Sequence, residues 1–196
     1  MIVNVRGCNG SGKTTISHTF FETYGPAEGI FEPNFRTKNE RKAIAHRLPG
    51  NLFIAGRYQA GCDGINYGGL KELVRALARE GHVIFENVLV SGNAKGIHEY
   101  RQTMPEQQWI WAFLDTPEDV CIARVYARRE EAKAAGWNHR QEKIDEPLMR
   151  SYYKRCRRSR ELLLERGVPA AEMPMIDHTD AFNQVRDILW EGGWRP

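Results

Sequence analysis

The feature that most constrains this chain is a glycine-rich segment near its N-terminus. Residues 7–14 read Gly-Cys-Asn-Gly-Ser-Gly-Lys-Thr, directly after the apolar run Ile2–Val5. Ile16 and Phe20 lie four residues apart beyond this loop, which is the spacing of one face of a helix. We therefore expect a strand, a tight loop and a helix, the arrangement that binds the phosphates of a nucleoside triphosphate.

The residues of this loop each have a physical role in such a site. Gly7 and Gly12 allow a sharp turn and a close approach of the backbone to the ligand. Successive N–H groups then form an anion site, which the positive end of the helix dipole reinforces. We predict that Lys13 binds the β- and γ-phosphates and that the Thr14 hydroxyl ligates Mg²⁺. The other expected phosphate contacts are Asn9, Gly10, Ser11 and Thr15.

Length and composition predict one domain, residues 1–196, with a net charge of +3. No apolar run approaches the roughly 20 residues of a membrane span, and the N-terminus has the pattern of a strand rather than of a signal peptide. The four cysteines are scattered and contain no C-x-x-C, which argues against a disulfide framework or a zinc site. A reducing, cytoplasmic setting is expected, and no membrane partner.

Apolar runs alternate with helical patterns along the chain. The expected strands are Ile2–Val5, Leu52–Ala55, Val83–Glu86, Trp109–Leu114 and Met173–Ile176. The expected helices are Thr14–Tyr24, Leu70–Glu80, Glu118–Ala135, Pro147–Arg166 and Ala181–Glu191, with Thr116 as the cap of the third. This alternation predicts an α/β fold of three layers, with a five-stranded, mostly parallel sheet flanked by helices.

Two stretches are less regular. Residues 42–48 and 52–58 are joined by Pro49-Gly50-Asn51, and they form either a hairpin or a helix followed by a strand. The polar segment Gly136–Glu146 is expected to be a mobile connection between two basic helices.

The guanine-binding motifs of GTPases are missing from the sequence. The features that are present together resemble the small P-loop kinases. The resemblance rests on the loop at Gly7–Thr14, the acidic strand end at Glu86, the segment Leu114–Glu118 before an arginine-rich helix, and Asp177–Asp180 after the last strand. It implies ATP and Mg²⁺ as cofactors, an arginine-rich lid at about residues 124–147, and an adenine site beside the last loop.

Phosphoryl transfer requires alignment and neutralisation of charge more than covalent help from the protein. Arg124 and Arg128 lie four residues apart, on one face of the expected helix, and are candidates to clamp the transferred group, together with Arg129 and Arg140. The alternative is a basic face that only contacts solvent.

Two carboxylates are candidates for contact with the acceptor hydroxyl. Glu86 ends a parallel strand, where ligands bind in such sheets, and would hold Mg²⁺ or accept the hydroxyl proton. Asp63, in a glycine-rich stretch, is the other candidate for this base. Arg57 would meet an acceptor phosphate, and Tyr58 would stack on a base. The alternatives are a buried carboxylate with local hydrogen bonds and a simple Asp-Gly turn.

The helix at Pro147–Arg166 has an expected inner stripe of Leu148, Tyr152, Cys156, Ser159 and Leu163. Its basic side chains suit the phosphates of a nucleic acid, although a lid that binds only ATP is the alternative. These candidate nucleic-acid contacts are Arg150, Lys154, Arg157 and Arg158.

The segments Gly56–Gly64 and Phe85–Ser91 resemble bacteriophage P-loop kinases of DNA hypermodification. That resemblance implies transfer of the γ-phosphate of ATP to 5-hydroxymethyluracil in phage DNA, inside the host cytoplasm, with the base taken out of the stack. Two other functions stay open from the residues: a nucleoside or nucleoside-monophosphate kinase with a free acceptor, and a nucleotide-binding regulator without turnover.

Overall fold

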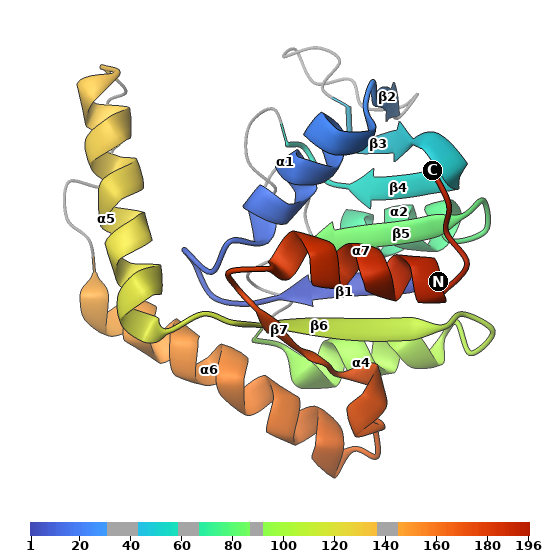
Figure 1. Cartoon of the computed structure of the whole chain (residues 1–196). Coiled ribbons are helices and arrows are strands. Elements are labelled where there is room, and N and C mark those ends of the chain that lie inside the picture. The colour runs from blue at the N-terminus through green and yellow to red at the C-terminus, as the bar shows by residue number, and fades with distance from the viewer. Residues whose placement is uncertain (31–42, 59–66, 87–91, 137–144) are drawn as a thin grey trace.

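Helices cover both faces of one sheet, which gives three layers (Figure 1). This computed structural model describes residues 1–30, 43–58, 67–86, 92–136 and 145–196. Within these ranges, no helix combines the length and the apolar character that a membrane crossing needs.

Among the described residues, seven strands form the sheet, rather than the five expected from sequence. Their order is β2-β3-β4-β5-β1-β6-β7, and the five strands from β4 to β7 run parallel. The predicted apolar runs became these parallel strands, and the side chains of β1, β4 and β5 are buried on both faces of the sheet. The strands are β1 (Ile2–Arg6), β2 (Glu28–Ile30), β3 (Ala45–Leu48), β4 (Leu52–Ala55), β5 (His82–Glu86), β6 (Trp109–Asp115) and β7 (Met175–Asp177).

The two additional strands lie antiparallel at one edge of the sheet. β3 and β4 form a hairpin, which resolves the ambiguity left by the sequence, and β2 pairs with β3. The turn at Pro49–Asn51 requires a glycine at position 50, where φ is +67°. A Cβ on this residue would also lie only 1.8 Å from the Arg195 carbonyl oxygen. The C-terminal residues therefore pack directly on this turn.

Apolar side chains from the helices fill the space on either side of the sheet. α1 and α7 cover one face, around Phe20 and Leu189, whereas α2, α4 and α6 cover the other, around Val74, Ile97 and Leu163. The helices are α1 (Lys13–Tyr24), α2 (Tyr67–Leu77), α4 (Ala94–Gln102), α5 (Glu118–Ala134), α6 (Glu146–Glu165) and α7 (Ala181–Glu191).

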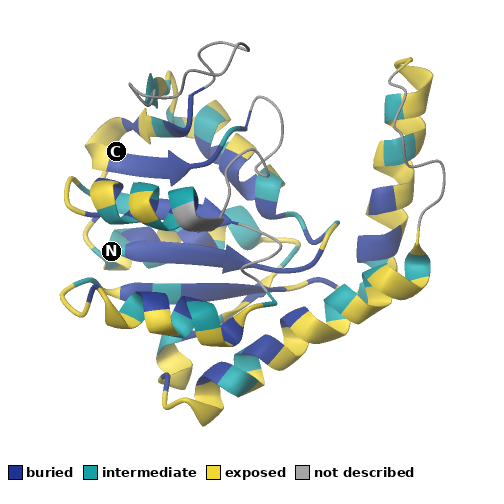
Figure 2. Ribbon diagram, turned by 180° about the vertical axis from the view of Figure 1, so that it is seen from behind, coloured by how far each residue is buried: buried dark blue, intermediate teal, exposed yellow. Residues whose placement is uncertain are grey.

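α5 and the first half of α6 project beyond the sheet, and Figure 2 shows that α5 is exposed over most of its length. The inner stripe expected for α6 is correct at Cys156, Ser159 and Leu163, which are buried. It is wrong at Leu148, whose exposed fraction is 50%, because this residue lies where the helix has left the sheet.

The parallel strands all end at the edge of the sheet that faces α5 (Figure 1). From β1 the chain passes to β4 and β5 on one side, and then to β6 and β7 on the other. Ligands bind at such a reversal of strand order, outside the carboxyl ends of the strands. The glycine-rich loop leaves β1 at this point.

Candidate active site

The glycine-rich loop joins β1 to α1 and has a backbone that only glycine allows. Gly10 and Gly12 have φ values of +80° and +99°. A Cβ on Gly10 would lie 2.2 Å from the Cys121 carbonyl oxygen, and one on Gly7 would lie 2.3 Å from Ser11 Oγ. The loop is thus packed against the first turn of α5, and its glycines permit that approach.

The side chain of Lys13 lies inside the loop that precedes it. It is only 5% exposed. Its ammonium donates a hydrogen bond to the Cys8 carbonyl oxygen at 2.8 Å, and Ser11 Oγ lies at 3.5 Å. A buried ammonium held at the mouth of an anion site is poised to meet phosphate oxygens.

A cavity of about 720 Å³ opens in front of the loop, and we refer to it as the main cavity. Its volume is within the usual range for a site that holds a nucleotide-sized ligand. The structure brings together here the loop residues that the sequence nominated, along with Glu86 and two arginines of α5. The lining residues that carry these roles are Asn9, Gly10, Ser11, Gly12, Lys13, Thr14, Thr15, Glu86, Arg124 and Arg128.

Glu86 is the last residue of β5 and is only 2% exposed. The sheet register sets it opposite Val5 of β1, two residues before the loop begins. The strand topology therefore delivers a buried carboxylate to the phosphate loop, as the sequence predicted. The Thr14 hydroxyl and this carboxylate line the same cavity, and such oxygen donors suit Mg²⁺.

Arg124 and Arg128 lie one turn apart on α5 and face the main cavity. Arg124 also donates a hydrogen bond to the Gly10 carbonyl oxygen at 3.4 Å, which links α5 to the loop. Arg129 is absent from the described lining of this cavity, and Arg140 lies outside the described residues.

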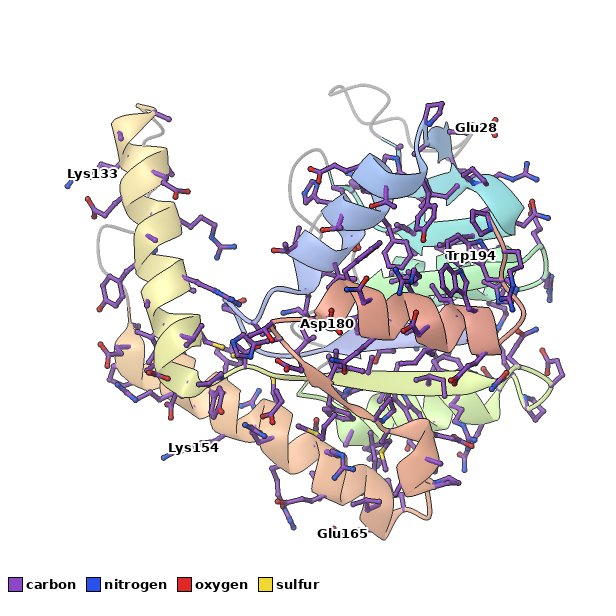
Figure 3. All side chains as sticks on the ribbon, in the orientation of Figure 1. Glu28, Lys133, Lys154, Glu165, Asp180 and Trp194 are labelled. Carbon is purple, nitrogen blue, oxygen red and sulfur yellow. The ribbon has the colours of Figure 1, made fainter. Side chains whose placement is uncertain are left out.

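The far wall of the main cavity comes from the segment between β7 and α7, where Figure 3 labels Asp180. His178, Thr179 and Asn183 contribute polar groups there, and Phe182 contributes a ring. His178 Nδ1 lies 3.1 Å from the Asp115 carbonyl oxygen, so the end of β6 fixes this wall. The sequence pointed to this segment without singling out a residue.

Thr116 has a different role from the one expected. No side-chain cap is present at the start of α5. The Thr116 hydroxyl instead donates to the Ser11 carbonyl oxygen at 2.9 Å and is buried. It therefore ties the phosphate loop to the end of β6. Sequence pattern does not reveal such a contact, because the partners are 105 residues apart.

The residues expected on the acceptor side fall outside the described lining of the main cavity. Tyr58 is buried, with its ring 5.5 Å from that of Phe21 and 6.0 Å from that of His18. Arg57 precedes it and is partly exposed. Asp63 lies outside the described residues.

The chain was compared with known proteins, and no family model matches it. It is 32% identical over 145 residues to a protein of Pseudomonas phage M6 named 5-hmdU DNA kinase, a match that covers 64% of this chain and 71% of that protein. The chain belongs to the 5-hmdU DNA kinase family. A 5-hmdU DNA kinase of Pseudomonas phage PaMx11 is 24% identical over 202 residues, with 96% of each chain covered.

Among solved structures, a deoxyadenosine kinase from M. mycoides with bound dATP is 15% identical, with a TM-score of 0.40 and coverage of 96% of this chain and 99% of that one. A likeness at this level is too distant for any residue role to be taken from it. Membership of the 5-hmdU DNA kinases nevertheless establishes that this chain is a kinase with a hydroxyl acceptor, as the sequence resemblance implied.

In this kinase, three of the four candidate nucleic-acid contacts on α6 have carboxylate partners. Arg150 pairs with Glu118 at 3.2 Å and Glu146 at 2.6 Å. Arg157 pairs with Asp115 at 2.6 Å. The third is Arg158, whose guanidinium contacts Glu161 and Glu165.

Lys154 is the remaining candidate, and it points from α6 into solvent (Figure 3). Arg155, which the sequence did not nominate, stacks over the Tyr152 ring at 5.3 Å. Its side chain also contacts Gly92, where a Cβ would lie 2.6 Å from Arg155 Cδ. Neither cation has an ion-pair partner within the described residues.

Proposed function

We propose that this kinase transfers the γ-phosphoryl group of ATP to the hydroxymethyl oxygen of 5-hydroxymethyluracil in phage DNA, within the cytoplasm of the infected cell. The name of its relatives supports the acceptor. The observation that carries the proposal is the main cavity, in which the phosphate loop, the buried carboxylate of Glu86 and two arginines meet. A passive nucleotide binder has no need of that carboxylate.

We propose one orientation for the nucleotide in the main cavity. Its phosphates would lie against the amides of residues 9–15, where Lys13 and the start of α1 supply positive charge. Its base and sugar would lie against Phe182 and the polar groups of His178 and Asn183. Arg124 and Arg128 would neutralise charge on the transferred group, and we propose that α5, which bears them, acts as a lid.

Thr14 and Glu86 are the proposed holders of Mg²⁺, directly or through water. The bound ion would neutralise phosphate charge. Glu86 is also the proposed group that orients the acceptor hydroxyl and takes its proton, with Asp63 as the alternative. As the hydroxyl oxygen attacks the γ-phosphorus, the bond to the β-phosphate oxygen breaks and ADP leaves.

Lys154 and Arg155 are the proposed contacts for the DNA backbone on α6, because they are not matched by carboxylates of the described residues. Arg155 lies against Gly92, just before α4. Arg150, Arg157 and Arg158 would contribute less, since each must leave an ion pair. A target base in a duplex must leave the stack to reach a site of this kind.

The decisive experiment offers γ-labelled ATP and four acceptors: nucleosides, nucleoside monophosphates, unmodified DNA and DNA with 5-hydroxymethyluracil. We expect label on the modified DNA alone, and none with Lys13→Ala. Label confined to nucleosides or their monophosphates would reject the DNA acceptor and leave the kinase assignment intact. ATP hydrolysis without transfer to any acceptor would reject both acceptor classes.

A further inference from the structure

Three cysteine thiols gather behind the phosphate loop. Cys8 belongs to the loop, Cys121 to the first turn of α5, and Cys156 to the inner face of α6. Their exposed fractions are 5%, 2% and 7%, and all three are free thiols. Neither phosphate binding nor phosphoryl transfer, as derived above, uses any of them.

Cys8 and Cys121 pack together in one cluster with Cys156. The neighbouring backbone is also close, since a Cβ on Gly10 would lie 2.2 Å from the Cys121 carbonyl oxygen. The loop and the first turn of α5 therefore bring these two cysteines together.

A second, smaller cavity gives Cys8 a route to solvent. It has a volume of about 160 Å³ and is lined by Cys8 and Cys156, which are not among the described lining residues of the main cavity. Tyr153 and Arg157, which are partly or fully exposed, form its outer wall. The space is several times that of a water molecule, which occupies about 30 Å³. A molecule the size of a peroxide therefore fits.

The three thiols differ in their tendency to ionise. The neighbouring Cys121 thiol and the nearby charge of Lys13 lower the pKa of Cys8, although burial opposes them. The neighbouring Cys8 thiol, together with burial, raises the pKa of Cys121. Burial is the main cause that raises the pKa of Cys156 to about 11. Cys8 is thus the thiol that most readily provides a nucleophilic thiolate, and Cys121 lies ready as its partner.

We propose that Cys8 and Cys121 are a peroxide-sensitive pair, and that a reversible disulfide between them prevents nucleotide binding. The Cys8 thiolate attacks one peroxide oxygen, the O–O bond breaks, and a sulfenic acid and one water form after proton transfer. The Cys121 thiol then loses its proton and attacks the Cys8 sulfur; the S–S bond forms, the S–OH bond breaks, and the hydroxide takes up that proton and leaves as a second water. The two cysteines lose two electrons and the peroxide gains them.

The disulfide would act through the loop backbone. The Cys8 carbonyl oxygen accepts hydrogen bonds from Lys13 Nζ at 2.8 Å and from the Ser11 amide at 3.3 Å. A bond from Cys8 to α5 would tie the loop that positions Lys13 to the helix that carries Arg124 and Arg128. This effect rests on the lid role proposed for α5, because the two arginines could then no longer move toward the phosphates.

The test oxidises the reduced full-length protein with hydrogen peroxide. Binding of a fluorescent ATP analogue is followed, and disulfides are mapped by mass spectrometry after digestion without reductant. We expect a Cys8–Cys121 linked peptide, a fall of at least tenfold in analogue affinity, and recovery of both after dithiothreitol. Because the mapping needs no acceptor, it is independent of whether DNA is the substrate.

Variants keep the proposal falsifiable. Cys121→Ser, with Cys121→Ala in reserve if the first fails to fold by circular dichroism, should bind nucleotide when reduced and show no linkage and no dithiothreitol-reversible loss. Cys156→Ser is the matched control and should behave as the wild type. A disulfide that joins Cys8 to Cys156 or to Cys62, or a Cys8–Cys121 bond that leaves affinity unchanged, would overturn the proposal.

Discussion

At the scale of single residues, the phosphate loop is held from several sides. Lys13 Nζ donates to the Cys8 carbonyl oxygen at 2.8 Å, and Thr116 Oγ1 donates to that of Ser11 at 2.9 Å. Gly10 fits against α5 because it has no side chain. These contacts hold the loop in shape without a ligand, so that binding a nucleotide orders little additional backbone.

Replacement of Lys13 tests whether its buried ammonium serves catalysis. Lys13→Met keeps the apolar stem and removes the charge that would meet the phosphates. We expect kcat to fall by about 10²–10³-fold, the loss typical of one removed electrostatic interaction with a transition state. Phosphoryl transfer in single-turnover assays measures it. Lys95→Met is the control, since Lys95 is exposed and pairs only with Glu99 at 3.8 Å among the described residues. Equal loss in both variants would contradict the role of Lys13.

Glu86 carries two proposed roles, and one variant weakens both without changing the glycine-rich loop. Glu86→Gln preserves size and one oxygen donor but cannot accept a proton. We expect kcat to fall by about 10²–10⁴-fold, as for removal of a general base, with the affinity for metal-free ATP unchanged. The comparison is with Glu80→Gln, which changes an exposed carboxylate after α2 and should retain activity. Full activity of Glu86→Gln would assign the proton to another group, with Asp63 first among them.

At the scale of elements, a helix or strand could be predicted from the sequence where its own residues carry a strong hydrophobic pattern. The parallel strands and α7 were readable because buried apolar runs and helical spacing are local signals. β2 escaped notice since it is three residues long and contains Gly29. α4 escaped as well, because only Ala94, Ile97 and Tyr100 of its short, polar sequence face the core. The Asn93 side chain caps α4 by accepting a hydrogen bond from the Gly96 amide. Asparagine is a common N-cap residue, so this position could have indicated the start of the helix.

α6 also allows the proposed DNA surface to be tested against the ion-paired arginines of the same helix. The double variant Lys154→Ala, Arg155→Ala should weaken binding to DNA and reduce the slope of log affinity against log salt by about 2, or about 1 for each phosphate that is no longer neutralised. Arg158→Ala is the control, because Arg158 is engaged by Glu161 and Glu165. Fluorescence anisotropy across a salt series measures both. Equal salt slopes for the double variant and Arg158→Ala would contradict a DNA-binding role for this surface. A rise in the KM for ATP of the double variant would contradict it as well, because it would assign these residues to the nucleotide site.

At the scale of the whole molecule, the donor half of the site was readable from sequence because strand topology gathers it. The loop, Glu86 and the two arginines of α5 converge as soon as the strands are parallel. The supporting contacts were not readable, since they join distant segments. The ion pair between Arg157 and Asp115 spans 42 residues and links α6 to the end of β6.

The C-terminal segment provides a further link of this kind, and its contribution to stability is measurable. Trp194 is fully buried, its indole N–H donates to the Pro49 carbonyl oxygen at 3.0 Å, and its ring lies 5.0 Å from that of Tyr24. It therefore joins the hairpin turn to α1. Trp194→Ala should lower the free energy of unfolding by about 3–5 kcal/mol, the usual cost of removing a large buried aromatic side chain.

Trp194→Phe keeps most of the buried apolar surface but leaves the Pro49 carbonyl without its donor, so a smaller loss of about 1–3 kcal/mol is expected. Urea denaturation of both variants measures these differences. Trp194 does not line the main cavity among its described residues, so kcat per folded molecule should stay at the wild-type value. A loss of kcat without a loss of stability would mean that the hairpin edge is coupled to the active site, rather than serving only to complete the core.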